Sequence, residues 1–269
     1  MKICRRGFAT YILLGFVLLI PDKAFSALPT LTDLDTEKLK DLSQTFSAVT
    51  AFKPVEPAGS IGDVWGASAG LVIGEVSTYK IKDYMGGSST ILPYIMPAIV
   101  INVPYGLAVE FGGLPPIAVS KASLELYGGD IKWTFTDVIW QKTKYFDAAI
   151  RGGYSSARIN YGQTVSGIPI KIDFNTAVTQ FSLSVGKNFR LVEPYVTFGY
   201  FSQTSTLGYE GTATIFDQTI SASSSVSAET SHLLFNAGFQ LKLLILTWAF
   251  EYNDVGGVNG FAMKLAFEI

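Results

Sequence analysis

The last ten residues of the chain alternate strictly between large apolar side chains and small or charged ones. The apolar set is Phe261, Met263, Leu265, Phe267 and Ile269, and Lys264 and Glu268 belong to the other set. A side-chain period of two is typical of a β-strand, and about ten residues suffice for a tilted strand to cross a bilayer. The C-terminus therefore predicts a membrane-spanning strand that is apolar toward lipid and polar toward a lumen.

The first 26 residues have the composition of a secretory leader. Basic residues precede an apolar stretch over residues 8–20, and Ala24-Phe25-Ser26 fits a cleavage site of small residues. The apolar stretch is short for a membrane anchor, which favours cleavage over retention. We therefore exclude residues 1–26 from the fold and expect an exported protein.

Loss of the leader changes the charge and the cysteine content. It removes four of the 20 basic and one of the 22 acidic residues, which leaves 16 and 21 and a net charge of −5. It also removes Cys4, the single cysteine, so no disulfide is expected. Mild acidity without blocks of Lys or Arg speaks against nucleic acid as a partner. With one histidine and no cysteine left, we expect neither a metal site nor a cofactor.

The mature sequence spreads its apolar residues over short alternating segments, without a run of about 18 that would form a transmembrane helix. Hydrocarbon cannot satisfy unpaired backbone amides, so such segments are stable in a membrane only as a closed barrel. The predicted fold class is all-β: a transmembrane antiparallel β-barrel of about ten strands over residues 60–269, with eight or twelve strands as alternatives, preceded by an amphipathic helix.

Alternating side chains and turn formers locate the candidate strands. They are residues 65–76, 94–102, 106–113, 120–135, 146–155, 181–186, 195–200, 232–241, 244–252 and 260–269. Pro97 fits its strand poorly, because proline donates no ladder hydrogen bond. An even strand number returns both termini to the periplasmic side. The Ser-, Thr- and Gly-rich segments 78–93, 157–168 and 205–228 are predicted to be extracellular loops.

Residues 30–52 have a different period. Leu39, Leu42, Phe46 and Val49 recur at three- and four-residue steps, which predicts an amphipathic helix. The small residues on the lumen face of the first strand would let this helix approach the wall closely. We expect the helix and linker, residues 27–59, to plug or lid the periplasmic mouth. A helix lying on the membrane surface or the barrel rim is the alternative.

Aromatic residues near the predicted strand ends suit a girdle at the lipid headgroups. The candidates are Trp65, Trp133, Phe135, Phe146, Trp248 and Tyr252. The alternative is that they are ordinary sheet aromatics of a soluble barrel.

Charged residues of both signs share the predicted lumen face. The constriction candidates are Lys132, Asp147, Arg151, Glu251 and Lys264, with Glu110 and Glu125 as further members. Buried charges normally pair, so one interpretation is a salt-bridge network that only fills the barrel. The functional interpretation is a constriction that selects small polar or amphiphilic solutes. Ten strands lie near the filled end of the barrel range, which argues against wide diffusion.

Nothing in the sequence indicates an enzyme, and we expect no catalytic residues. His232 is the only histidine, its neighbour Ser231 points to the opposite face, and no Gly-x-Ser-x-Gly motif occurs. A narrow or gated channel, or a structural membrane protein, is the favoured function. An adhesin acting through its extracellular loops is the rival, and an outer-membrane hydrolase comes third.

Two predicted hairpins resemble those of a known group of proteins. One has Gly128-Gly129-Asp130-x-Lys132 leading to Asp147–Tyr154, and the other has Ser184-x-x-Lys187-x-Phe189 leading to Pro194-Tyr195-x-x-x-Gly199-Tyr200. Over residues 60–269 the chain resembles outer-membrane β-barrel proteins of Gram-negative bacteria. The resemblance implies location in the outer-membrane bilayer and insertion by the barrel machinery through residues 260–269. It carries over no functional residues, and Ile269 departs from the terminal aromatic of many such proteins.

Overall fold

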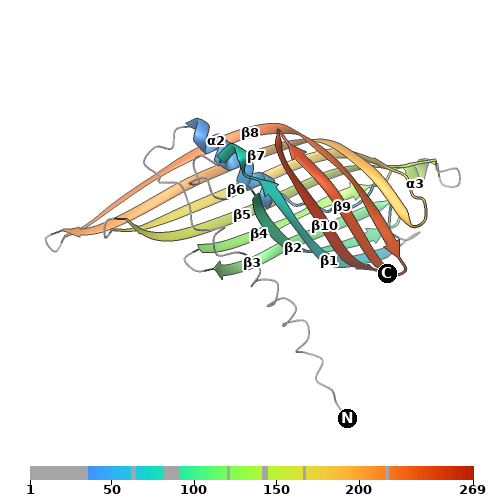
Figure 1. Cartoon of the computed structure of the whole chain (residues 1–269), viewed down its shortest axis with the longest axis horizontal. Coiled ribbons are helices and arrows are strands. Elements are labelled where there is room, and N and C mark those ends of the chain that lie inside the picture. The colour runs from blue at the N-terminus through green and yellow to red at the C-terminus, as the bar shows by residue number, and fades with distance from the viewer. Residues whose placement is uncertain are drawn as a thin grey trace, which may run out of the picture.

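Ten antiparallel strands close into a single barrel in the order β1-β10-β9-β8-β7-β6-β5-β4-β3-β2 (Figure 1). The structure is a computed structural model, and it describes residues 36–61, 65–81, 91–119, 122–140, 145–165, 168–215 and 218–269. The expected leader, residues 1–26, lies outside the described residues. The predicted fold class, a ten-stranded antiparallel transmembrane barrel with an N-terminal helix, is confirmed.

The strands follow one another around the barrel. They are β1 (Gly66–Ser77), β2 (Ile91–Val103), β3 (Leu107–Val119), β4 (Ala122–Trp133), β5 (Asp147–Val165), β6 (Ile168–Gly186), β7 (Val192–Ile215), β8 (Gln218–Leu243), β9 (Leu246–Val255) and β10 (Val258–Glu268). The helical elements are α2 (Thr36–Thr50), the 3-10 turn η3 (Tyr79–Ile81) and α3 (Thr136–Ile139). In the described residues, no helix is long and apolar enough to cross a membrane.

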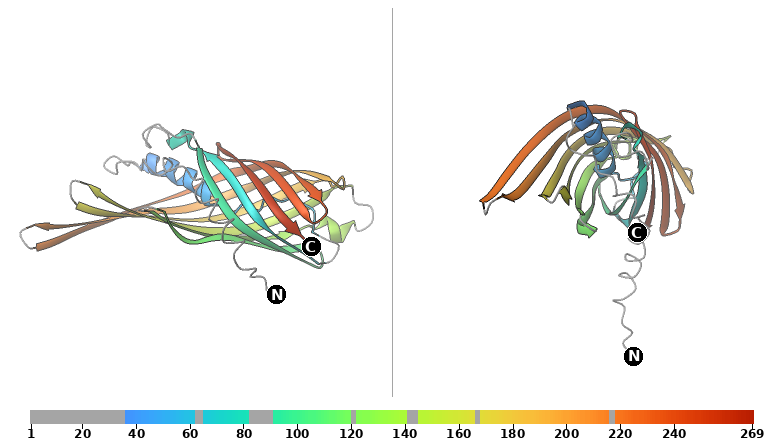
Figure 2. Two further views of the ribbon diagram at one scale, coloured as in Figure 1. Left: turned by 60° about the horizontal axis from the view of Figure 1, so that its bottom comes forward. Right: turned by 60° about the vertical axis from the view of Figure 1, so that its left-hand side comes forward.

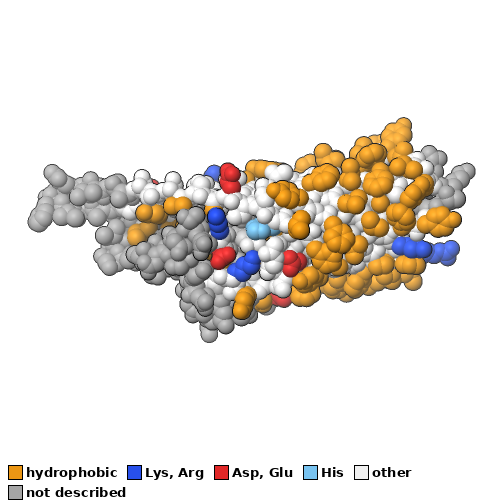
Figure 3. All heavy atoms as spheres, turned by 90° about the horizontal axis from the view of Figure 1, so that it is seen from above, with side chains coloured by type: hydrophobic (Ala, Val, Ile, Leu, Met, Phe, Trp, Pro, Cys, Tyr) orange, Lys and Arg blue, Asp and Glu red, His pale blue; other side chains and the backbone are white. Residues whose placement is uncertain are grey.

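The side-chain alternation sorts the two faces of the wall. Six outward residues are between 52% and 60% exposed, namely Ile99, Phe111, Ile131, Phe181, Phe198 and Phe261. Their neighbours in sequence point inward and are at most 5% exposed, namely Val100, Glu110, Lys132, Ser182, Thr197 and Ala262. Hydrophobic side chains gather over the half of the barrel that carries the C-terminus (Figure 3). This apolar outer face is the surface that hydrocarbon solvates.

Four strands extend beyond the rest of the barrel. β7 and β8 have 24 and 26 residues, against ten in β9, and their hairpin projects far past the other strands (Figure 1). The segments predicted as loops over 157–168 and 205–228 are therefore mostly strand, so that prediction was wrong. Their Thr, Tyr and Ile residues favour strands, and this preference outweighs the turn signal of the serines and glycines.

The N-terminal segment runs inside the barrel. β1 begins beside the C-terminus, where Ala67 and Ile269 exchange backbone hydrogen bonds. From there the preceding residues, 61 back to 51, run through the lumen, and α2 lies within the curve of the sheet at the other end (Figure 2). We call residues 51–61 the linker, the end with the C-terminus the lower end, and the other end the upper end.

Candidate functional site

The upper half of the lumen is filled by α2. From Leu42 to Thr50 its side chains are almost all buried, and Ser43, Thr45 and Ser47 are fully inaccessible. Phe46 packs against Phe174 with ring centroids 5.3 Å apart. A helix on the membrane surface or the rim would expose one face, so that alternative does not describe this structure.

The helix packs against a second part of the wall, on β1, β2 and β10, away from the β6 residue Phe174 that Phe46 contacts. Ala48 and Val49 pack with Val76, Leu92 and Val258. The ends of β1 and β9 and the starts of β2 and β10 meet here, which places α2 at the upper end. The segment therefore runs inside the barrel, and the linker carries the helix beyond the lower end, where the termini of the barrel lie. Which end faces the periplasm stays a prediction. The side chain of Leu39 lies outside the described residues.

Polar bonds fasten α2 to the upper rim. Gln44 Nε2 donates to the carbonyl oxygens of Val255 and Gly256, both at 3.0 Å. Lys80, on η3, donates to Gln44 Oε1 at 3.0 Å and to Gly256 O at 2.9 Å. Deeper in the lumen, the hydroxyl groups of Ser47 and Thr176 lie 2.8 Å apart. We call the hydrogen bonds of Gln44 and Lys80 the rim latch; they join the helix to the upper ends of two hairpins of the wall.

The lower half of the lumen is filled by the linker, whose backbone is held by wall side chains. Five donors reach its carbonyl oxygens: Gln180 to Phe52 (3.1 Å), Arg151 to Pro57 (3.3 Å), Thr134 to Ala58 (2.7 Å), Lys132 to Gly59 (3.0 Å) and Asn102 to Ile61 (2.9 Å). The amide of Gly59 donates to Glu193 Oε1 at 3.2 Å. An extended chain has no internal ladder, so these donors satisfy groups that burial would otherwise leave unpaired.

A cluster of six buried charges joins the linker to the wall. Its members are Glu56 from the linker and Glu110, Asp130, Lys132, Arg151 and Lys264 from β3, β4, β5 and β10. Arg151 Nη1 lies 2.8 Å from Glu110 and 3.3 Å from Asp130. Lys132 lies 3.4 Å from Glu56 Oε2, and Lys264 pairs with Glu56 Oε1. The three cations thus face three carboxyl groups, of which Glu56 alone comes from the linker.

Glu56 is held ionised by this arrangement. Burial alone would raise its pKa, but Lys264, Lys132 and Arg151 outweigh burial and lower the pKa to about 2. Lys53, three residues earlier, has the opposite environment. Burial lowers the pKa of Lys53 to about 7, and the distant charge of Glu251 only partly opposes it. Lys53 donates to Ala48 O and lies 4.4 Å from the centre of the Tyr94 ring.

All five predicted constriction residues are buried on the lumen face. Lys132, Arg151 and Lys264 belong to the charge cluster, whereas Asp147 lies at the first residue of β5. Glu251 accepts a hydrogen bond from Tyr195 at 2.9 Å. Glu110 faces inward as expected, but Glu125 was assigned to the wrong face. It has the strand parity of the exposed residues Tyr127 and Ile131 and pairs with Arg158 across the sheet.

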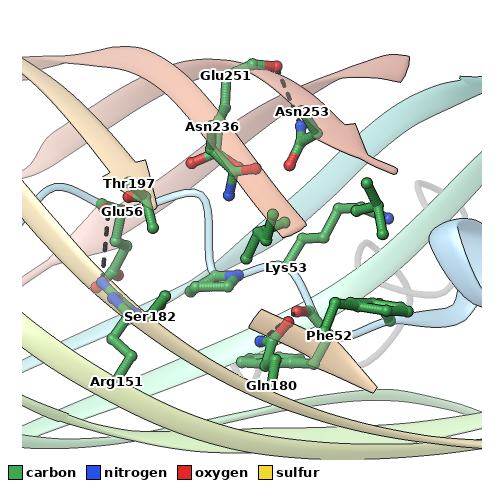
Figure 4. A pocket seen from close by; sticks show the side chains of 15 residues that line it. Phe52, Lys53, Glu56, Arg151, Gln180, Ser182, Thr197, Asn236, Glu251 and Asn253 are labelled. Atoms are coloured by element: carbon green, nitrogen blue, oxygen red, sulfur yellow. Dashed lines mark hydrogen bonds between the residues drawn. The ribbon is translucent and has the colours of Figure 1, made fainter. Parts of the chain in front are cut away.

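A small cavity remains between the linker and β6 to β9 (Figure 4). Its volume of about 30 Å³ is room for one or two waters. Asn236, Glu251 and Asn253 line it, and each has a buried oxygen without a hydrogen-bond partner among the described residues. The three oxygens suit one or two water molecules, and the volume is too small for a larger solute.

The predicted girdle residues lie mostly at one end. Trp133, Phe135, Phe146, Trp65 and Trp248 lie at or near the lower ends of their strands, whereas Tyr252 lies farther up β9 against Phe261. Trp65 is 67% exposed and Trp133 39%. Their contact with headgroups stays a prediction. His232 faces the lumen at the upper rim, next to Gly256, and Ser231 is hydrogen-bonded to Ser202.

Sequence reasoning missed the role of Glu56 and Phe52. Glu56 lies in a segment that was assigned as a linker, Lys53-Pro54-Val55-Glu56-Pro57, where two prolines and two charges suggest solvent. Phe52 is the last residue of the range that was predicted as a helix, residues 30–52. A charge in a segment that must cross a barrel was the signal that could have found Glu56.

Comparison with known proteins gives a family and distant barrels. The sequence model of DUF6588, described as a family of unknown function, matches residues 31–269. No curated protein matches the sequence. Similar solved structures include Ail, the attachment invasion locus protein of Yersinia pestis, with a TM-score of 0.32 and 14% identity over 76% of this chain and 97% of that one. The N-terminal β-barrel domain of Pseudomonas aeruginosa OprF has a TM-score of 0.31 and 12% identity over 76% and 97%. The translocator domain of autotransporter NalP from Neisseria meningitidis has a TM-score of 0.36 and 11% identity over 86% and 94%. Scores of this size carry no argument about activity.

Proposed function

We propose that this chain, which belongs to the family of unknown function DUF6588, is a gated channel of the outer membrane that its own N-terminal segment closes. The observation that carries the proposal is the filling of the lumen by residues 42–61. The solutes are small polar or amphiphilic molecules. The proposal includes cleavage of the leader, residence in a Gram-negative outer membrane and insertion through residues 260–269, and it assigns no catalytic role.

The chemistry of the contacts favours a removable plug over a permanent core. Beside apolar contacts of Phe52 and Val55, the linker is fastened by one carboxylate and a set of side-chain to backbone hydrogen bonds, and polar contacts of this kind exchange readily with water. A barrel that needed only a filled interior could use apolar packing, which is at least as stable as a buried ion pair. The cost of buried charges is therefore explained by a segment that leaves and returns.

Planar-bilayer recordings test the proposal directly. The channel of the mature chain should be closed for most of the time. A variant that lacks residues 30–58 should conduct continuously, because nothing then fills its lumen. Heat-dependent migration on gels and circular dichroism should first establish that the deleted barrel folds. A folded deletion variant without conductance would refute the channel.

A single substitution gives a finer test in the complete chain. Glu56→Gln removes one charge of the cluster and should raise the fraction of time that the channel is open. Glu229→Gln, at an exposed position on β8, is the matched control and should leave gating unchanged. Equal behaviour of the two variants would show that the charge cluster does not hold the plug.

One observation favours surface binding as a second candidate. The β7–β8 hairpin extends far beyond the length that crosses a bilayer, and residues 223–227 are exposed. A shortened hairpin that lacks residues 206–227 should then lose attachment of cells to a host surface while conductance is kept. Retained attachment would remove this candidate.

A further inference from the structure

Strands β2 and β3 are paired over only part of the height of the barrel wall. Their ladder covers only Ala98↔Gly112 to Val103↔Leu107, although both strands continue for several residues toward the upper end. There β2 pairs with β1 and β3 pairs with β4, and the described residues show no β2–β3 pair. We call this unpaired stretch, residues 91–97 and 113–119, the seam.

Four prolines disfavour hydrogen bonding between β2 and β3 along the seam. Pro93 and Pro97 lie on β2, and Pro115 and Pro116 lie at the register shift of β3. The carbonyl oxygen of Pro97 lies 2.8 Å from where a Cβ at Gly112 would be, so this residue directs its backbone groups at β3. Proline offers no donor there, and Pro93 has the same strand parity. The unpaired edge therefore leaves fewer amide groups without a partner in hydrocarbon.

An aromatic side chain of the linker closes the inner side of the seam. Phe52 is 2% exposed and packs with Met96, Leu126 and Ala157, and Leu114 lies against this cluster. Gly112 and Gly128 make room for its ring, because an added Cβ at either would come within 2.7 Å of Phe52. Removal of Phe52 would leave an apolar pocket that faces the seam.

The outer side of the seam faces lipid. Just below it, Ile99 and Phe111 are 52% and 58% exposed, and Ile91 and Pro93, within the seam, are also exposed. The path from the pocket through the seam is thus apolar from end to end. A polar solute would lose its hydration on this path, whereas an acyl chain would lose nothing.

The linker carries its charge close to this apolar group. Glu56 follows Phe52 by four residues, and its two carboxylate oxygens pair with Lys132 and Lys264. Lys264 has no other carboxylate partner among the described residues, so departure of the linker would leave this buried cation without an anion. The linker therefore presents an apolar tail group and a carboxylate to two adjoining receptors on the wall.

We propose that the linker occupies the site of an anionic amphiphile, whose carboxylate head binds Lys132 and Lys264 and whose single apolar tail passes between lumen and membrane through the seam. This inference rests on the proposed function, since it names the solute class of the same channel. The two receptors and the seam come from different strands, so head and tail recognition can be tested separately.

Binding is tested first, on the complete mature chain in a non-ionic detergent. Phe52→Leu shortens the tail group of the linker, and Glu56→Ala vacates the head receptor. In the double variant, decanoate should raise the unfolding temperature at a concentration roughly tenfold below that needed by acetate, which has no tail, or by decyltrimethylammonium, which has the wrong charge. Adding Lys132→Gln and Lys264→Gln should abolish the shift. Equal responses to all three probes would overturn the proposal, and a preference for decyl phosphate over decanoate would overturn the carboxylate assignment.

The seam is tested by cross-linking, because the mature chain has no cysteine of its own. Met96→Cys with Leu114→Cys places a pair at the second unpaired position, two steps beyond Ala98↔Gly112. Ile99→Cys with Phe111→Cys is the matched control on the same strands, inside the ladder. In lipid nanodiscs, oxidation of the seam pair should slow the uptake of parinaric acid, a fluorescent carboxylate amphiphile, by about tenfold or more, and reductant should restore it. Oxidation of the control pair should change nothing. Unchanged uptake with a closed seam would overturn the lateral route.

These outcomes separate the two proposals. If the variant that lacks residues 30–58 conducts but decanoate does not stabilise the double variant, the gated channel is supported and the amphiphile site is refuted. If decanoate binds through both lysines but no variant conducts, the receptor stands and the gated channel falls. Should the double variant not fold, Glu56→Ala alone keeps Phe52 and tests the head receptor with acetate and inorganic phosphate.

Discussion

The two halves of the lumen are filled by the same segment in different ways. The upper half holds α2, which packs Phe46, Ala48 and Val49 against apolar clusters of the wall. The lower half holds the linker, which is extended and joined to the wall by ion pairs and by hydrogen bonds to its backbone, in addition to apolar contacts of Phe52 and Val55. Apolar packing tolerates small shifts, whereas an ion pair between fixed strands does not. The charge cluster therefore fixes the register of the segment and contributes most to stability, whereas the helix adds apolar packing of smaller effect.

The largest loss of unfolding free energy is expected for Arg151→Ala in the lower half. It removes the cation beside Glu110 and Asp130 and leaves two buried carboxylates without a guanidinium, which should cost about 3–5 kcal/mol of unfolding free energy. Denaturant titration in detergent measures it. Arg158→Ala, on the same strand but exposed, is the control and should cost under about 1 kcal/mol. Similar losses for both would mean that the charge cluster contributes little.

A smaller loss of unfolding free energy is expected for Phe46→Ala in the upper half. The ring is half-buried, so we expect about 2 kcal/mol, below the range for fully buried phenylalanine. The same titration applies, with the exposed Phe189→Ala as control. A loss as large as that of Arg151→Ala would show that the upper half dominates and would reverse the comparison.

The boundary between the halves should respond to pH through Lys53. Its pKa is about 7 in the folded chain and about 10.5 when unfolded, so between these values the unfolded chain binds more protons. Stability therefore rises with pH, by about 1 kcal/mol from pH 6 to pH 8. Unfolding curves at the two pH values measure the change, and Lys53→Met should flatten it. A slope that survives this substitution would assign the effect to another group.

The smallest effect is expected at the rim latch. Gln44→Ala removes the donor to Val255 and Gly256 and the acceptor for Lys80, and it should cost about 1 kcal/mol, the usual net value of such hydrogen bonds. Hydrogen exchange of α2 should report it better than global unfolding, because local opening is enough to expose the helix. Unchanged protection of α2 would show that the latch is dispensable.

Much of this architecture follows from the sequence. Alternation predicted ten strands and assigned Lys132, Arg151 and Lys264 to the lumen, because side chains of a strand point to opposite faces whatever the strand pairs with. The helical period of Leu42, Phe46 and Val49 predicted α2 in the same way. The assignment of Glu125 failed because its parity was not carried through β4, and the long hairpins were missed because Ser and Thr suit both loops and strands.

What the sequence by itself determined is local: a period of two, a period of about 3.6, and therefore which side chains face lipid, lumen or a helix partner. Only closure of the barrel decided the rest. Glu56 meets Lys132 and Lys264 from 76 and 208 residues away, α2 lies at the upper end, and β2 parts from β3 above Ala98. Such contacts depend on how strands from distant parts of the chain are brought side by side, and no short window of sequence contains that information.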